Sequence, residues 1–378
     1  MGSPNSFQNR RQFLRTSAVT LAAGALPVLP SGLLAAESKP AARAAGSPSQ
    51  PYRIILDTDP GVDDAIAIFL ALRSPELKVE AVTPVSGNVP LSLTLPNALR
   101  LVEIAGRTDI PVAAGASEPL VRRLVTAKYA HGINGLGGVE FPEPKLKPVA
   151  ETANEIMTRL IRANPHEISI VAIGPLTNVA TVLKSDPSIA PLIKSIVIMG
   201  GSLSGGNITP AAEFNLYVDP EAARIVFDAG VPLTMIGLDV TRKVVIHEEQ
   251  VRALEAAQNP VSQAAGKILR SNFERMRKMS AASVGFAMHD PLTIAQLIDP
   301  SMVTLTDYFV EIETSGELTA GETVGYAHGP VRRSPPMESG LPPTEPVEAE
   351  FKSNAKVAVD VEPDKFFRLL LARLTSAA

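Results

Sequence analysis

Short runs rich in β-branched residues alternate with stretches of helical periodicity along this chain, and this alternation constrains the fold more than any other feature. The first run, residues 53–57, is followed by apolar residues at helical spacing over residues 63–73, and similar pairs recur as far as residue 258. Successive strand–helix units favour a parallel sheet with helices packed on both faces. We therefore expect an α/β fold in a single domain, with an open, mostly parallel central sheet flanked by helices in a Rossmann-like arrangement.

The pattern gives bounds for the expected elements. Strands are predicted at residues 53–57, 79–86, 110–114, 168–173, 195–199 and 233–240. Helices are predicted at residues 63–73, 92–105, 153–163, 176–184, 221–229 and 248–258. The C-terminal part predicts helices at 261–279 and 291–297, a strand hairpin from 303–313 and 323–327, a proline-rich loop at 330–346, and a final strand and helix at 355–361 and 364–374.

The first 50 residues have the composition of a targeting segment. Arg10-Arg11, followed by Phe13-Leu14 and a mildly apolar stretch, resembles a bacterial twin-arginine export signal; the alternative is a disordered basic tail. We expect residues 1–50 to form an export signal and linker, and residues 51–378 to form one folded domain. Such a signal implies the twin-arginine export machinery as a partner and the bacterial periplasm as the location.

Composition excludes several classes of function. The chain of 378 residues has no cysteine, which rules out disulfides, thiolate metal sites and a cysteine nucleophile. The formal net charge is −4, and the aromatic residues are five tyrosines and twelve phenylalanines without tryptophan, so we expect no nucleic-acid partner. No apolar run reaches the roughly 18–20 residues that a membrane span requires.

Four carboxylates lie within eight positions at the end of the first predicted strand and just after it: Asp57, Asp59, Asp63 and Asp64. Asp63 and Asp64 also suit the N-terminus of the next helix, which accounts for only two of the four. Carboxylates so close together repel one another unless a cation or a shared proton offsets their charge. Because ligands of open α/β sheets bind at the carboxyl ends of the strands, we expect a site for calcium or magnesium there.

A series of short polar motifs follows in order along the chain. The series is Ile54-Ile55-Leu56-Asp57-Thr58-Asp59-Pro60-Gly61-Val62-Asp63-Asp64-Ala65, Ser86-Gly87-Asn88, Gly174-Pro175-Leu176-Thr177-Asn178, Met199-Gly200-Gly201, Gly206-Asn207, Ala212-Glu213-Phe214-Asn215, Asp219-Pro220-Glu221 and His289-Asp290-Pro291. Each motif is weak alone, but the ordered set is specific, and it resembles the inosine–uridine-preferring nucleoside hydrolases over nearly all of residues 51–378. The resemblance implies an enzyme that hydrolyses the N-glycosidic bond of ribonucleosides to ribose and free base, with bound Ca²⁺.

The resemblance also implies roles for individual residues. Calcium would be held by the carboxylates of Asp59, Asp64 and Asp290 and by the backbone carbonyl of Ile173. Asp59 would in addition be the general base that takes a proton from a calcium-bound water. The ribose would be contacted by Asp63, Asn88, Met199, Asn207, Glu213 and Asn215, with Asn88 also beside Asp59. Carboxylate and amide oxygens suit the positive charge that develops on the sugar in the transition state of glycoside cleavage.

His131 and His289 match positions that the family uses on the base side of the pocket. Each could protonate the leaving base or hydrogen-bond to it. The alternatives are that His289 orients Asp290 and that His131 is an ordinary loop histidine. Without tryptophan, stacking on the base would fall to Tyr129 or Phe286, which are near the two histidines in sequence, and the base preference stays open.

Two other functions share part of this pattern. An exported nucleoside- or ribose-binding protein with little turnover would keep the same site, but it would not need Asp59 to activate water. A phosphatase of the haloacid-dehalogenase-like type also begins with Asp-x-Asp after a strand, but Pro60-Gly61 fits that pattern poorly and the predicted pocket is acidic. The family resemblance further implies a homo-oligomer, either a dimer or a tetramer.

Overall fold

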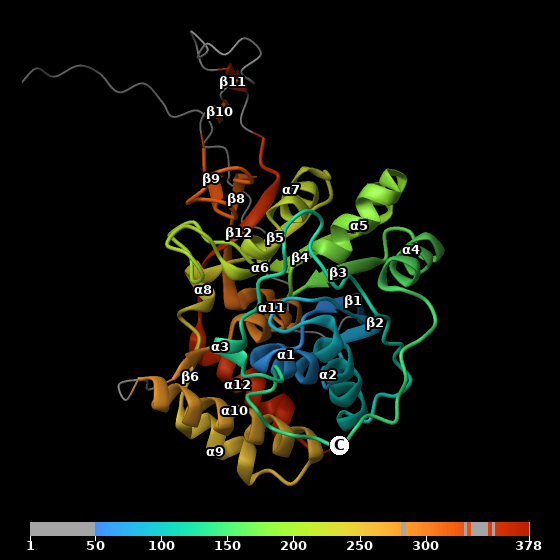
Figure 1. The fold of residues 1–378 in the computed structure, drawn as a ribbon, viewed down its shortest axis with the longest axis vertical. Coiled ribbons are helices and arrows are strands. Elements are labelled where there is room, and N and C mark those ends of the chain that lie inside the picture. Colours follow the sequence, from blue (N-terminus) through green and yellow to red (C-terminus); the bar gives the residue numbers. More distant parts are fainter. Residues whose placement is uncertain (1–49, 281–284, 329–330, 334–346, 350–351, 378) are drawn as a thin grey trace, which may run out of the picture. The chain divides into compact units, whose positions relative to one another are not determined.

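An eight-stranded sheet in the order β2-β1-β3-β4-β5-β12-β8-β9 is the framework of the computed structural model, which describes residues 50–280, 285–328, 331–333, 347–349 and 352–377 (Figure 1). Its strands are β1 (Tyr52–Thr58), β2 (Leu77–Pro84), β3 (Ile168–Ala172), β4 (Ser195–Met199), β5 (Leu233–Ile236), β8 (Val303–Ile312), β9 (Thr323–Tyr326) and β12 (Ala355–Val361). Neighbouring strands from β2 to β12 are parallel, and β8 and β9 extend the sheet antiparallel. The predicted α/β fold is confirmed.

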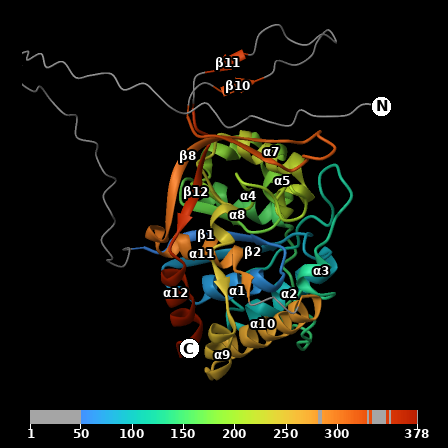
Figure 2. The ribbon, with the colours of Figure 1, turned by 90° about the vertical axis from the view of Figure 1, so that its left-hand side faces the viewer.

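Helices cover both faces of the sheet. They are α1 (Val62–Leu72), α2 (Leu91–Ile104), α3 (Lys128–His131), α4 (Ala153–Ala163), α5 (Thr177–Ser185), α6 (Phe214–Val218), α7 (Pro220–Asp228), α8 (Leu238–Thr241), α9 (Glu248–Ala256), α10 (Pro260–Met279), α11 (His289–Ile298) and α12 (Pro363–Thr375), with the 3₁₀ turns η1 (Pro187–Leu192) and η2 (Pro300–Met302). Figure 2 shows α1, α9, α10 and α12 on one side of the sheet and α4, α5 and α7 on the other.

Each face of the sheet has its own hydrophobic core. Ile54 and Leu56 of β1 belong to the cluster that includes α1, α2, α10, α11 and α12. Ile55, between them, belongs to the cluster that includes α4, α5 and α7. Successive side chains of a strand point to opposite faces, so a strand between two helical layers must be apolar at every position. This explains why the strand pattern was a continuous apolar run rather than an alternating one.

The prediction of a strand at residues 110–114 is wrong. These residues make only an isolated parallel bridge, between Val112 and Val82. The carbonyl of Pro111 accepts a hydrogen bond from the N–H of Val82 at 3.0 Å. Proline has no N–H to donate, so a regular ladder cannot extend through this segment.

The strand predicted at residues 233–240 is only half correct. It ends at Ile236, and Leu238–Thr241 form the short helix α8 instead. The carbonyl of Gly237 accepts from the N–H of Thr241 at 3.1 Å, which closes a helical turn. A short apolar run fits a buried strand and a buried helical turn equally well, so periodicity could not separate the two.

The C-terminal proline-rich segment also differs from its prediction. Within residues 330–346, predicted as a loop, Val331–Arg333 form β10, which pairs antiparallel with β11 (Val347–Ala349). Valine favours strands, and the number of prolines concealed this short run. Residues 334–346 lie outside the described residues. A second two-stranded ribbon pairs β6 (Val245–Ile246) with β7 (Phe286–Ala287).

The N-terminal segment that carries the predicted export signal, residues 1–49, lies outside the described residues. Among the helices that the structure does describe, none combines the length and the apolar character needed to cross a membrane.

Candidate active site

The turn between β1 and α1 is held by the side chain of Asp64. Its Oδ1 accepts from the hydroxyl of Thr58 at 2.7 Å and from the N–H of Asp59 at 3.2 Å. Its Oδ2 accepts from the N–H of Gly61 at 2.9 Å, and a carboxylate at this third helical position completes the start of a helix. This local structure fixes Asp59 just before α1 and Asp63 in its first turn.

Asp59 is fully buried, and one of its carboxylate oxygens has no hydrogen-bond partner among the described residues. Its Oδ2 accepts from the backbone N–H of Asn88 at 2.7 Å, whereas Oδ1 is the unpaired atom. Gly87 and Gly174 make room for this side chain, because a Cβ would lie 2.1 Å from Oδ2 at the first and 2.7 Å from Oδ1 at the second. Burial, with the nearby charge of Asp64, raises the pKa of Asp59 well above its usual value.

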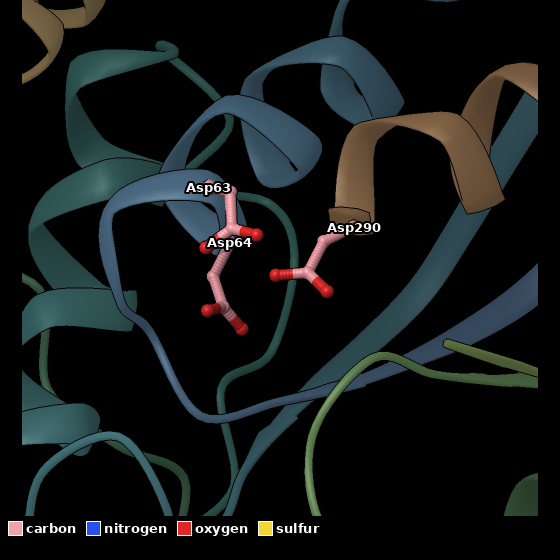
Figure 3. Close-up of side chains that lie close together, drawn as sticks. All are labelled: Asp63, Asp64 and Asp290. Carbon is pink, nitrogen blue, oxygen red and sulfur yellow. The ribbon is translucent and has the colours of Figure 1, made fainter. Parts of the chain in front are cut away.

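Asp63, Asp64 and Asp290 form a buried cluster that could hold a metal ion. One oxygen of each carboxylate lies within 4.8 Å of the others. Figure 3 shows Asp290, at the start of α11, facing the two carboxylates of α1. Burial raises the pKa of Asp63 to about 7 and that of Asp290 well above its usual value, and neighbouring carboxylates add to both shifts. A divalent cation would offset this repulsion, and a donor set of oxygen atoms alone suits calcium or magnesium.

The predicted calcium ligands lie around this cluster. Asp64 and Asp290 are members of it, and the third member is Asp63 rather than Asp59. Asp59 contacts the cluster through its N–H bond to Asp64. Ile173 lines the same cavity as Asp63 and Asp290, and its backbone carbonyl accepts a hydrogen bond from Nδ2 of Asn215 at 3.1 Å. The assignment of individual ligands stays a prediction.

A cavity of about 170 Å³ opens beside the carboxylate cluster. All the side chains predicted to contact the substrate line it: Asp63, Asn88, His131, Met199, Asn207, Glu213, Asn215 and His289. Ile173 and Asp290 line it as well, and so do the two candidates for stacking on the base, Tyr129 and Phe286. The tertiary structure therefore brings together residues that are far apart in the sequence, although their individual roles stay predictions.

Glu213 and Asn215 are held by backbone groups on the side of the cavity next to α6. Glu213 caps α6, and its carboxylate accepts from the N–H groups of Asn215 at 2.9 Å, Gly201 at 3.1 Å and Leu216 at 3.2 Å. Burial nevertheless raises the pKa of Glu213 to about 7. Asn215 Nδ2 donates to the carbonyl of Met199 at 3.1 Å as well as to Ile173. Side chains held in this way are suited to bind the hydroxyl groups of a ligand, which both donate and accept hydrogen bonds.

His131 and His289 both line the cavity, and they are close enough to interact electrostatically. Nδ1 of His131 accepts from the N–H of Val62 at 3.0 Å, and Nδ1 of His289 is 2.7 Å from the hydroxyl of Thr241. Burial lowers the pKa of both imidazoles to about 4. For His289 the proximity of His131 adds to this shift. Both rings are therefore neutral near pH 7.

Sequence reasoning missed the contribution of α10 to the cavity. Asn272 and Met276 line it, and their spacing of four places them on one face of the helix. The neighbouring Arg275 donates to the backbone carbonyls of Tyr129 and Ala130, which ties α10 to the segment that ends at His131. The spacing of Asn272 and Met276 can be seen in the sequence, but nothing in the sequence indicates that this face of α10 lines the cavity.

Comparison with known proteins identifies the family of this chain. The family described as inosine-uridine preferring nucleoside hydrolase matches residues 54–368. A pyrimidine-specific ribonucleoside hydrolase RihA from Citrobacter koseri is 44% identical over 325 residues, which cover 85% of this chain and 97% of that protein. The RihA of Escherichia coli O1:K1 is 45% identical over 324 residues, again 85% of this chain and 97% of that protein.

Solved structures agree with this family. A plant nucleoside hydrolase, the PpNRh1 enzyme, superposes with a TM-score of 0.77 at 35% identity and covers 86% of this chain and 100% of its own. An inosine-guanosine nucleoside hydrolase superposes with a TM-score of 0.73 at 30% identity and covers 86% of this chain and 99% of its own. The chain thus belongs to the inosine-uridine preferring nucleoside hydrolase family and is a ribonucleoside hydrolase.

Proposed function

We propose that this enzyme cleaves the N-glycosidic bond of ribonucleosides in a calcium-dependent reaction, with Asp59 as the general base. The observation that carries the proposal is the buried carboxylate cluster of Asp63, Asp64 and Asp290, two of which line the cavity with the other polar side chains. A bound Ca²⁺ would lower the pKa of a water molecule beside it. The unpaired Oδ1 of Asp59 is the acceptor available for the proton of that water.

In the proposed reaction, a water molecule replaces the base on C1′ of the ribose. Water bonds through its oxygen to C1′ of the ribose as Asp59 takes its proton. The bond between C1′ and the base nitrogen breaks, and its electron pair leaves with the base. Asn88 holds Asp59 in place, and oxygens of Asn207, Glu213 and Asn215 stabilise the positive charge on the sugar.

The two histidines act on the leaving base as hydrogen-bond donors. A neutral imidazole is too weak an acid to give up its ring proton, but its N–H stabilises negative charge that builds on the base. The departing base takes its proton from solvent, and Asp59 later returns the proton that it accepted. Of the two roles predicted from sequence, protonation of the base and hydrogen bonding to it, we propose the second.

We propose pyrimidine ribonucleosides as the preferred substrates. The support comes from the relatives that are 44–45% identical to this chain, which are named pyrimidine-specific ribonucleoside hydrolases. The inosine-guanosine nucleoside hydrolase is 30% identical. Phosphorylated substrates are disfavoured, because none of the described residues that line the cavity is a lysine or arginine and the cluster beside it is acidic.

The test is the release of free base and reducing sugar from uridine, cytidine, inosine, adenosine and guanosine, with and without a calcium chelator. Chelator-sensitive release, fastest from the two pyrimidine nucleosides, is the expected result. Binding of uridine without release would instead support a nucleoside-binding protein. Equal rates with and without the chelator would refute the role of the metal, and faster cleavage of inosine would refute the base preference.

We further propose that the protein is exported through the twin-arginine pathway and acts as a homodimer or homotetramer. Arg10-Arg11 and Phe13-Leu14 support the export route. Replacing both arginines by lysine should retain the protein in the cytoplasm of a bacterial host, and equal periplasmic amounts would contradict the proposal. Light scattering of the purified enzyme measures the oligomeric state directly.

A further inference from the structure

Thr241 contacts the side chain of His289, which lines the cavity. Its hydroxyl oxygen lies 2.7 Å from Nδ1 of the imidazole, and the threonine is fully buried. Thr241 is the last residue of α8, the short helix that the sequence pattern concealed. A hydrogen bond between a buried hydroxyl and one imidazole nitrogen fixes the orientation of the ring, and the direction of the bond fixes the position of the ring proton.

The buried hydroxyl group of Thr241 indicates the direction of this hydrogen bond. The large majority of buried hydroxyl groups in proteins have a hydrogen-bond partner. Among the described residues, His289 Nδ1 is the acceptor in contact with Thr241 Oγ1. With the hydroxyl as donor and the lone pair of Nδ1 as acceptor, this O–H group is satisfied. In a neutral imidazole the proton then sits on Nε2, and because His289 lines the cavity, this N–H is available to a ligand there.

His131 shows the same arrangement, with a backbone group in place of the hydroxyl. The N–H of Val62 donates to Nδ1 of His131 at 3.0 Å, and an amide N–H can act only as a donor. His131 therefore also carries its proton on Nε2 and also lines the cavity. Two different protein groups thus fix the same tautomer in two neighbouring rings.

We propose that Thr241 is a positioning residue that holds His289 as an Nε2–H donor directed at the leaving base. This inference rests on the proposed function of the site. The hydrogen bond should matter when the base leaves as a poor anion, as it does from a natural nucleoside. It should matter little for 4-nitrophenyl β-D-ribofuranoside, whose leaving group is stable as an anion without a donor.

The kinetic test compares Thr241→Val, Thr241→Ser and a matched control, Thr293→Val. Thr293 is also a fully buried threonine, and it lies on α11 with His289, but its hydroxyl has no partner among the described residues. For Thr241→Val we expect kcat on uridine to fall about tenfold, as for the weakening of one donor to a developing anion. KM should be unchanged, and kcat on 4-nitrophenyl β-D-ribofuranoside should stay within about twofold of the original.

Thr241→Ser keeps the hydroxyl and should restore kcat on uridine, whereas Thr293→Val should match the unmodified enzyme on both substrates. Equal losses on the two substrates would indicate a merely structural role for Thr241 and would overturn the proposal. An unchanged ratio of the two kcat values in Thr241→Val would overturn it as well.

A spectroscopic test does not depend on turnover. Protein labelled with ¹⁵N-histidine should show the His289 ring protonated at Nε2, with Nδ1 as a hydrogen-bonded acceptor, and the resonance is assigned by its loss in His289→Gln. In Thr241→Val the signature of the hydrogen-bonded acceptor should disappear. A proton on Nδ1 in the unmodified enzyme would refute the proposal. Failure of the proposed function is a separate result, because it would appear as no base release by the unmodified enzyme.

Discussion

Asn88 bonds to Asp59 and to the carboxylate cluster at the same time. Its backbone N–H donates to Oδ2 of Asp59 at 2.7 Å, and its side-chain Nδ2 donates to Oδ2 of Asp64 at 2.9 Å. Asn88 is itself buried, in the segment that follows β2. One residue therefore fixes the proposed base relative to the carboxylate cluster, and it leaves the second oxygen of Asp59 unpaired.

Replacing Asp59 by Asn tests the proposed base. The amide keeps the size of the side chain and can still accept from the N–H of Asn88, but it cannot take a proton from water. We expect kcat on uridine to fall by about 10²–10⁴-fold, the range for loss of a general base. Without Ca²⁺, thermal unfolding should show an unchanged or higher Tm, because one of several crowded buried carboxylates is removed. Turnover within tenfold of the original enzyme would contradict the assignment.

Metal removal should lower both activity and stability. Without a cation, Asp63, Asp64 and Asp290 repel one another within 4.8 Å. At 100 times its dissociation constant, an ion that binds only the folded state stabilises it by about 2.7 kcal/mol. Chelation should therefore lower the Tm measured by calorimetry, and added Ca²⁺ should restore it. In Asp290→Asn the response to Ca²⁺ should shrink, and an identical response there would exclude Asp290 as a ligand.

Asp239 should affect substrate affinity without contacting substrate. It lies on α8, and its carboxylate accepts from the N–H of Leu203 at 2.8 Å and from the hydroxyl of Ser204 at 2.6 Å, which braces the loop that leads to Asn207. We expect Asp239→Asn to raise KM for uridine about threefold to tenfold, since a small misplacement of a contact residue weakens binding. The control is Asp228→Asn on α7, an exposed position, which should leave KM unchanged.

Glu248 should account for part of the loss of stability in acid. Arg277, Arg270 and Arg252 bond to its carboxylate and lower the pKa of Glu248 to about 2. A carboxylate with a lowered pKa in the folded state stabilises it above the pKa of the unfolded chain, near 4.3, and this contribution is lost as the pH falls toward 2. Because the carboxylate is partly exposed and solvent screens its charge, we expect a small effect.

The measurement for Glu248 is urea unfolding between pH 7 and pH 2.5. Glu248→Gln should be less stable than the original protein at pH 7, and the difference should narrow as the pH falls. Glu249→Gln is the matched control, because Glu249 is exposed on the same helix and has no ion pair among the described residues. A constant difference across this pH range would contradict the assignment.

The sequence alone determined the order of the strands and helices along most of the chain. The runs at Ile168–Ala172 and Ser195–Met199 are short, apolar and β-branched, and the helix Ala153–Ala163 has a capping threonine and a clear amphipathic period. These are local properties, so they can be read without the fold. Predictions failed where the local signal was equivocal, at Pro111 and after Gly237.

The sequence also identified the side chains of the candidate site, because its motifs carry them in order, and all eight predicted substrate contacts line one cavity. Only the tertiary structure decided which of them meet. Asp290 reaches Asp63 because α11 packs against α1, and Asn272 reaches the cavity because α10 packs beside α3. Such contacts depend on how the sheet orders its strands and how the helices cover it. Local periodicity says which face of a helix is apolar but not which element that face will meet.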